Sequence, residues 1–287
     1  MNKEYTIRDL YEIYCEAMPR YPLAYERFRD ILHKDNSQIF TAESSKTIIG
    51  FVVVNGNSVV ILCVKKDYRH SGYGKHLLIM AEGFISANYD EVILGGSGLL
   101  QGVPCDNDEE SSVPFFEKRG YSADFISVNM GLELNDKAVE KLKEIPRPNG
   151  VTYRFADDND REKLLAAVKD AQAEWLPVFE ENSDAPVLLA VCGDEIAGFE
   201  MVEEYGGMFF SDNEKHSMIG CVGVTHKYRR RGIGLAMTAE GSLSLYEKNC
   251  KDIQLLYVER VAWYNKLGYE VTSRQWMGRK KIQDIMF

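Results

Sequence analysis

The chain has 287 residues, of which 45% are hydrophobic and 27% are charged, and its formal net charge is −10. This is the composition of an ordinary globular protein. No unbroken apolar stretch reaches the ~20 residues that a membrane helix needs. The acidic charge disfavours nucleic acid and favours a cationic partner, although solubility alone also explains such a charge.

The six cysteines show neither CxxC nor zinc-finger spacing, and several lie in apolar runs. The first ten residues carry charges where a secretory signal would be apolar. We therefore expect reduced cysteines, no metal site, no membrane segment and a cytoplasmic protein.

Apolar spacing predicts the elements of the first half in chain order. They are a helix ending near Met18, a helix at 23–33, strands at 38–43, 48–55 and 59–64, a helix at 74–88 and a strand at 91–94. A long glycine-rich, acidic loop at 95–112 follows, and a loop of this length is uncommon without a role. A short helix at 112–119, a closing strand pair at 121–134, and a helix with a linker at 135–150 complete this half.

The second half repeats this plan. It is predicted to contain a strand at 151–155, a helix at 160–174, an aromatic-rich break at 175–179, strands at 187–191, 196–202 and 218–224, and a helix that begins after Gly232. A long hairpin at 203–217 joins the last two strands.

The strand at 218–224 leads into the pattern Arg229-x-x-Gly232-x-Gly234. Glycines let the backbone approach a bulky ligand, and a helix that starts there directs its unpaired N–H groups and positive dipole end towards an anion. A P-loop would need a longer glycine-rich run ending in Gly-Lys-Ser/Thr. A dinucleotide fingerprint would need a third glycine where Met237 stands.

The same pattern occurs twice. Arg69-x-x-Gly72-x-Gly74 precedes the second copy by 160 positions. Two further blocks match at an offset of 148: residues 48–52 with 196–200, and 116–121 with 264–269. Because the three blocks keep their order, we interpret the chain as a duplication of one domain, with domains at 1–145 and 151–287.

This three-block pattern resembles the GNAT acetyltransferase superfamily, present in tandem over nearly the whole chain. The most specific parts are the Arg-x-x-Gly-x-Gly turn and the later aromatic-x-Lys-x-Gly-Tyr. The resemblance implies an α/β (α+β, mixed sheet) fold in two tandem GNAT-like domains. It also implies acetyl-CoA as cofactor, with the pantetheine arm lying where the fourth and fifth strands splay apart.

The resemblance also implies which residues hold CoA. In the second half, strand backbone holds the pantetheine and polarises the thioester carbonyl, and the turn amides bind the pyrophosphate. The candidate CoA-binding residues are Cys221, Val222, Gly223, Val224, Arg229, Arg230, Arg231, Gly232, Ile233, Gly234 and Leu235, with Val64, Arg69, Gly72 and Gly74 in the first half.

Tyr264 is the candidate catalytic acid, because the tyrosine at this motif position in GNAT enzymes commonly protonates the CoA sulfur. A core aromatic is the alternative. The first half has Phe116 at the matching position and so lacks the phenol. We therefore expect the second domain to be catalytic. For the first domain two roles stay open: binding CoA, or shaping the acceptor cleft.

Glu200 is the candidate general base, because it interrupts an apolar strand where the first half has Val52. A position on the water-exposed face of the sheet is the alternative. Its rivals are Glu203, Glu204 and His216. A covalent route through Cys63 or Cys221 is conceivable, but small buried residues explain both better.

The sequence thus predicts an N-acetyltransferase that moves an acetyl group directly from acetyl-CoA to the amine of a small molecule or peptide. The alternatives are a non-catalytic acyl-CoA-binding or regulatory module, and an acyltransferase with another acyl group or acceptor. The acceptor and the oligomeric state cannot be read from the residues.

Overall fold

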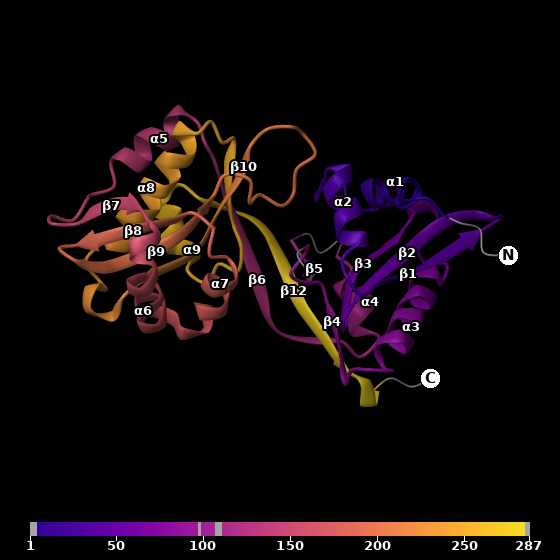
Figure 1. Ribbon diagram of the computed structural model, residues 1–287. Coiled ribbons are helices and arrows are strands. Elements are labelled where there is room, and N and C mark those ends of the chain that lie inside the picture. Colours follow the sequence, from indigo (N-terminus) through magenta and orange to yellow (C-terminus); the bar gives the residue numbers. More distant parts are fainter. Residues whose placement is uncertain (1–4, 97–98, 107–110, 285–287) are drawn as a thin grey trace. The chain divides into compact units, whose positions relative to one another are not determined.

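The computed structural model describes residues 5–96, 99–106 and 111–284 (Figure 1). The chain forms two compact units. The first comprises Met1–Ser127, Phe209–Asp212 and Ser273–Phe287, and the second comprises Val128–Met208 and Asn213–Thr272. Each unit is described by itself below.

The first unit is a mixed sheet with strand order β1-β2-β3-β4-β12. The β3–β4 pair is parallel, and the β1–β2, β2–β3 and β4–β12 pairs are antiparallel. Its elements are α1 (Ile7–Ala17), α2 (Tyr25–Leu32), β1 (Ser37–Ser44), β2 (Thr47–Asn55), β3 (Ser58–Val64), α3 (Tyr73–Ile85), β4 (Glu91–Leu94), β5 (Val103–Pro104), α4 (Val113–Glu117) and the start of β6 (Ser122–Glu133).

Helices cover both faces of this sheet (Figure 1). On one face, α1 and α2 bury Leu10, Ile13 and Phe28 against β2 and β3. On the other, α3 buries Leu77 and Ala81. The continuous apolar run of β2 follows from this arrangement, because both of its faces are buried.

The second unit repeats the arrangement with strand order β6-β11-β10-β9-β8-β7. The β10–β11 pair is parallel, and the other pairs are antiparallel. Its elements are α5 (Asp136–Lys143), β7 (Thr152–Phe155), α6 (Arg161–Gln172), α7 (Leu176–Glu181), β8 (Val187–Cys192), β9 (Glu195–Glu203), β10 (His216–Val224), α8 (Ile233–Glu247), β11 (Asp252–Leu255), α9 (Val261–Tyr264) and the start of β12 (Glu270–Lys281).

In this unit, α5 and α8 cover one face of the sheet, and α6 and α7 cover the other (Figure 1). Leu142 of α5 and Met237 of α8 belong to the first core. Val168 of α6 and Phe179 of α7 belong to the second. The two cores identify the side of the sheet on which each site residue lies.

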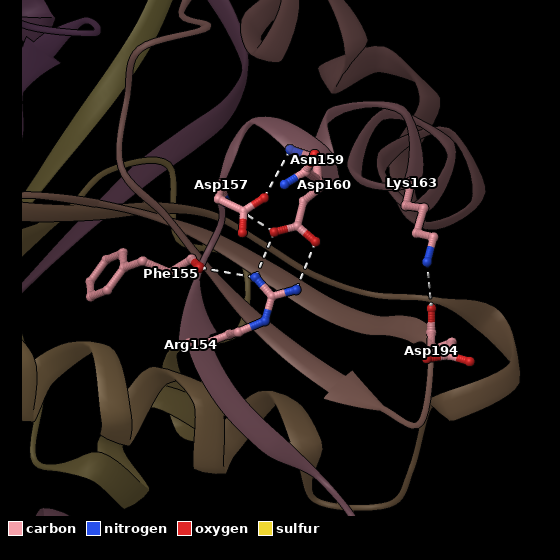
Figure 2. Close-up of polar contacts among 7 residues, drawn as sticks. All are labelled: Arg154, Phe155, Asp157, Asn159, Asp160, Lys163 and Asp194. Carbon is pink, nitrogen blue, oxygen red and sulfur yellow. Dashed lines mark hydrogen bonds and ion pairs between the residues drawn. The ribbon is translucent and has the colours of Figure 1, made fainter.

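An ion pair fastens α6 to the edge strand β7 (Figure 2). Arg154 donates from both terminal nitrogens to the two carboxylate oxygens of Asp160, with Nη2 2.7 Å from Oδ1. The backbone N–H of Asp157 donates to the same carboxylate at 2.9 Å. The hydrogen bonds from Arg154 lower the pKa of Asp160 to about 2, so the pair stays charged at neutral pH.

Two strands pass between the units. β6 begins in the first unit and continues into the second, whereas β12 begins in the second and ends in the first. The division therefore differs from the continuous segments 1–145 and 151–287, because the last strand completes the sheet of the first unit by pairing with β4. Residues 209–212 of the long β9–β10 connection also belong to the first unit, where Phe209 packs on Tyr21.

The predicted α/β fold with a mixed sheet is confirmed, and most predicted elements lie within a few residues of the observed ones. Two predictions are wrong. Residues 122–133 form one strand, β6, rather than a strand pair, because β6 pairs with the distant β11. The break at 175–179 is the start of α7, where Pro177 occupies the first turn and needs no N–H partner there. Part of the 95–112 loop, residues 97–98 and 107–110, lies outside the described residues.

No helix in the described part of the chain is long and apolar enough to cross a membrane. All six cysteines are free thiols.

A buried ion pair secures the exchanged strand β12 in the first unit. Lys280 of β12 lies 3.2 Å from Glu82 of α3, and each side chain is 7% exposed. The Tyr121 hydroxyl also donates to Glu82, at 2.9 Å. We predict that Lys280→Met destabilises the first unit by about 3–5 kcal/mol, because it leaves a buried carboxylate without its cation.

Hydrogen exchange of the β4 and β12 amides measures this loss within the first unit. The double variant Lys280→Met/Glu82→Leu is the control. It removes both charges together and should recover most of the lost protection. Wild-type rates of hydrogen exchange in Lys280→Met would contradict the role assigned to this ion pair.

Candidate functional site

The turn between β10 and α8 presents a helix N-terminus. Gly232 begins α8 with φ of 80°, a left-handed conformation that favours glycine, and Arg230 shares it with φ of 64°. The first amides of a helix lack intrahelical partners and carry its positive dipole end. The first unit has the same turn, with Gly72 at 91° and His70 at 60°. Both units therefore keep the geometry of an anion-binding turn.

Arg229 shapes this turn. Its Nε donates to the Val224 carbonyl at 3.0 Å, and Nη2 donates to the Ala171 carbonyl at 2.9 Å. Arg69 repeats the first contact with the Val64 carbonyl at 3.1 Å. The arginine thus fastens the turn to the strand end, while Arg230 and Arg231 are exposed.

In the second unit, β10 and β11 separate. Their parallel pairing runs from His216–Asp252 to Met218–Gln254. Beyond β11, the Val258 N–H donates to the Val128 carbonyl of β6, at 2.7 Å. The chain therefore leaves β10, and the register that pairs β10 with β11 ends at Met218. This part of β10 contains four of the residues predicted to hold the cofactor, namely Cys221, Val222, Gly223 and Val224.

A β-bulge shapes the same edge. The register between β10 and β9 shifts between Gly220 and Gly223, so that Cys221 and Val222 lie opposite the single residue Glu200. Cys221 has φ of 50°, which is strained for a residue with a side chain. Bulges of this kind leave backbone groups outside the ladder and are common beside active sites.

In the first unit, the chain that follows β4 bonds to β3 and packs with it. After β4, the Gly95 N–H donates back to the Val59 carbonyl of β3, at 2.8 Å. Leu99 and Leu100 then pack in one core with Val60, Ile61 and Cys63 of β3. The turn residues Arg69, Gly72 and Gly74 are thus present, and Gly95, Leu99 and Leu100 of the unit's own chain bond to or pack with β3.

Tyr264 ends the four-residue helix α9. Gly268, with φ of 99°, ends the 3₁₀ turn that follows. The preceding Trp263 packs against Gly234, so the phenol is anchored to the anion-binding turn. The Tyr264 ring meets that of Tyr269 edge-on at 5.8 Å, and the side chain is partly buried. Burial is the main cause of its raised pKa, so the phenol is protonated at neutral pH.

Glu200 is fully buried, at 0% exposure. Its side chain faces α8, where the Thr238 hydroxyl donates to Oε2 at 2.8 Å. Desolvation raises the pKa of Glu200 to about 8, although the Thr238 hydrogen bond opposes this shift. The alternative of a solvent-facing Glu200 is therefore wrong. The carboxyl is enclosed, so in this structure it has no direct access to an acceptor in solution.

The rivals of Glu200 differ in their surroundings. Glu204 pairs with Lys215 at 3.2 Å and with Lys248 at 2.8 Å. His216 is a buried strand residue whose Nδ1 lies 3.0 Å from Asp252 Oδ2, at the opposite end of β10 from Val224. Glu203 is half-buried, its side chain has no hydrogen bond or ion pair within the described residues, and burial raises its pKa.

The two strand cysteines are poor nucleophiles. Burial raises the pKa of Cys63 to about 12 and that of Cys221 to about 11. Because the thiolate is the reactive form, both side chains are inert thiols near neutral pH.

Thr238 and Gly241 also belong to this site, and the sequence analysis did not single them out. Both lie on α8 beside Glu200. The repeat holds the signal that identifies them: the first half has Leu78 and Ala81 at the matching positions, 160 residues earlier.

Comparison with known proteins supports these geometric parallels. Residues 35–123 match the family described as "Acetyltransferase (GNAT) domain". This segment lies in the first unit and contains its copy of the turn. No curated protein matches the sequence.

Solved structures match nearly the whole chain at low identity. A glucosamine N-acetyltransferase region of a fungal multi-domain β-N-acetylglucosaminidase has a TM-score of 0.77 and 18% identity, covering 96% of this chain and 37% of that protein. The GCN5-related N-acetyltransferase of Sphaerobacter thermophilus has a TM-score of 0.71 and 20% identity, covering 98% and 95% of the two chains. A tandem GNAT protein from the clavulanic acid biosynthesis pathway has a TM-score of 0.67 and 14% identity, covering 96% and 95%.

The raised pKa of Glu200 makes a prediction about stability. The unfolded chain loses this proton near pH ~4.3, whereas the folded unit holds it to about pH 8. The contribution to stability is therefore complete below the unfolded pKa and is lost as the pH rises through the folded one. Between these pH values we expect Glu200 to remove about 1 kcal/mol of unfolding free energy per pH unit.

Urea unfolding of the wild type and Glu200→Gln across this range measures the difference between their slopes. The glutamine stays uncharged, so the variant should lack the contribution from Glu200. Parallel pH dependences in the two proteins would show that the carboxyl titrates normally.

Proposed function

We propose that the second unit transfers an acetyl group from acetyl-CoA directly to an amine. The match of residues 35–123 to the acetyltransferase (GNAT) domain family and the likeness of the fold to that of a tandem GNAT protein support this proposal. In this reaction a bond forms between the amine nitrogen and the acetyl carbon, and the carbon–sulfur bond breaks. The amine gives up one proton, and the CoA sulfur gains one.

The single observation that carries the proposal is the combination, in the second unit, of an open strand edge with a phenol. The 219–224 edge of β10 directly precedes the anion-binding turn in the chain, and Trp263 of α9 packs against that turn next to Tyr264. The turn amides suit the CoA pyrophosphate, and the open edge suits the pantetheine arm. Backbone N–H groups at the Cys221 bulge would polarise the thioester carbonyl.

Tyr264 is the proposed acid. A departing thiolate is stabilised when a positioned donor gives it a proton, and the Tyr264 phenol keeps its proton at neutral pH. Direct transfer is preferred to an acetyl-cysteine because the pKa of Cys221 lies at about 11.

Glu203 is the side chain proposed to take up the amine proton, directly or through water. It ends β9 on the face of α6 and α7, the face on which Cys221 also packs. Its half-buried carboxylate has no counter-ion within the described residues, and such a group would attract a cationic amine. Glu200 lies on the opposite face, against α8.

The first unit is proposed to have no transferase site of its own. Leu99 and Leu100 pack in one core with β3, and Phe116 is 6% exposed where the second unit has its phenol. One acetyl-CoA per chain follows from this. The acceptor class is an amine on a small molecule or peptide, and the glucosamine acetylated by one structural neighbour is one compound to test.

Changing Tyr264 tests this assignment. We predict that Tyr264→Phe lowers kcat by about 100-fold or more, because the thiolate then leaves without a proton donor. The measurement is release of CoA thiol from acetyl-CoA with a panel of polyamines, amino acids, amino sugars and peptide N-termini.

Phe116→Leu is the matched control, since it alters the corresponding position of the first unit. It should leave kcat near the wild-type value. If Phe116→Leu lost turnover and Tyr264→Phe kept it, the assignment of catalysis to the second unit would be contradicted. If no acceptor in the panel causes release of CoA thiol, the result would count against an N-acetyltransferase.

A further inference from the structure

Glu200 carries a buried polar atom that the fold leaves unexplained. Its Oε2 accepts the Thr238 hydroxyl, but Oε1 has no hydrogen-bond partner within the described part of the chain. An unpartnered buried oxygen costs roughly 1–3 kcal/mol. A carboxyl in this position therefore requires a reason beyond stability.

A glycine makes room for this oxygen. A Cβ atom added to Gly241 of α8 would lie 2.2 Å from Oε1, well inside contact distance. The same atom would lie 3.4 Å from the Ile219 side chain of β10. A residue with a side chain at position 241 therefore excludes the observed position of the carboxyl.

The first unit shows that this fold does not need the carboxyl. It replaces the acid, its hydroxyl partner, the glycine and the phenol together, and its substitutes are all apolar. Val52, Leu78, Ala81 and Phe116 stand at the positions of Glu200, Thr238, Gly241 and Tyr264. The carboxyl pocket thus occurs in the unit that has the phenol.

Side chains connect this pocket to Tyr264. Ser242, one turn after Thr238, donates to the Thr238 carbonyl at 2.7 Å. Its hydroxyl lies 2.9 Å from that of Tyr269, whose ring packs edge-on against Tyr264. A negative charge on Glu200 would raise the pKa of both phenols.

Few titratable groups face Glu200. On α8 it meets Thr238 and Gly241, which do not titrate near neutral pH. The titratable groups that interact with its charge are Tyr264 and Tyr269. Around Tyr264 the further groups are Arg260, which lowers its pKa, and Cys221, which raises it.

We infer that Glu200 is a positioning residue for Tyr264: while uncharged it lets the phenol give its proton to the CoA thiolate, and when ionised it withholds that proton. This inference rests on the proposed transfer function. It assigns to Glu200 a role other than that of general base.

The phenol O–H bond breaks, the proton moves to the CoA sulfur, and a phenolate remains near Glu200. A carboxylate at Glu200 opposes the phenolate by like-charge repulsion in a medium of low dielectric, whereas a neutral carboxyl does not. The phenolate then regains a proton from solvent, which has received the proton of the amine.

The predicted effect is a loss of turnover at alkaline pH. With a pKa of about 8, Glu200 is uncharged at neutral pH and ionised above it. The wild type should therefore lose most of its kcat between about pH 7 and about pH 9. Glu200→Gln stays neutral, so its kcat should fall by less than about twofold over the same interval.

The experiment compares kcat against pH for the wild type, Glu200→Gln and Glu247→Gln. Glu247 is an exposed carboxylate on the same helix, so its variant controls for the loss of one acid and should keep the wild-type profile. Circular dichroism at each pH confirms that all three proteins remain folded. The inference would be overturned if Glu200→Gln lost kcat at alkaline pH as the wild type does. It would also be overturned if Glu200→Gln were folded but inactive, because Glu200 would then be the base.

A second readout does not depend on turnover. ¹³C NMR of labelled tyrosine side chains follows ionisation of Tyr264, assigned by comparison with Tyr264→Phe. The inference predicts that this phenol titrates at lower pH in Glu200→Gln than in the wild type. An unchanged titration would overturn it. If the Tyr264 titration shifts but the protein acetylates no acceptor, the coupling between Glu200 and Tyr264 stands and only the proposed function is contradicted.

Discussion

The proposed site exists because the parallel strands β10 and β11 stop pairing partway along β10. Their ladder ends at Met218 and Gln254, and the chain after β11 bonds to β6 instead. Backbone groups removed from a ladder must find other partners, and a ligand can supply them. The open edge, the bulge at Cys221 and the helix N-terminus at Gly232 all follow one another along one strand–turn–helix segment. In the first unit the chain after β4 still bonds to β3, from the Gly95 N–H to the Val59 carbonyl.

Duplication allowed the two units to diverge without losing the fold. Each keeps the strand–turn–helix segment and its left-handed glycine, Gly72 or Gly232, because the turn requires it. They differ where chemistry is proposed. The first unit packs Leu99 and Leu100 into a core with β3, whereas the second buries a carboxyl beside Gly241 at a cost to stability. The exchanged strand β12 makes the first unit depend on the end of the chain.

The repeat made much of the fold predictable, since glycine spacing and apolar periodicity are local signals. Sequence reasoning also identified Glu200 as a residue at odds with its strand. It did not predict which way the side chain faces, because both faces of β9 are buried and its apolar run shows no alternation. The exchange of β12 was missed, since strand partners far apart in sequence leave no local pattern. Residues 175–179 do not form the predicted break, because Pro177 fits within the first turn of α7, and that position depends on where the helix begins.

The most direct test of the central claim is a crystal structure of the chain grown with a non-hydrolysable acetyl-CoA analogue. The account predicts one analogue per chain, with its pyrophosphate at the Gly232 turn and its pantetheine along residues 219–224 of β10. A pantetheine lying along β3 of the first unit, or one in each unit, would contradict it.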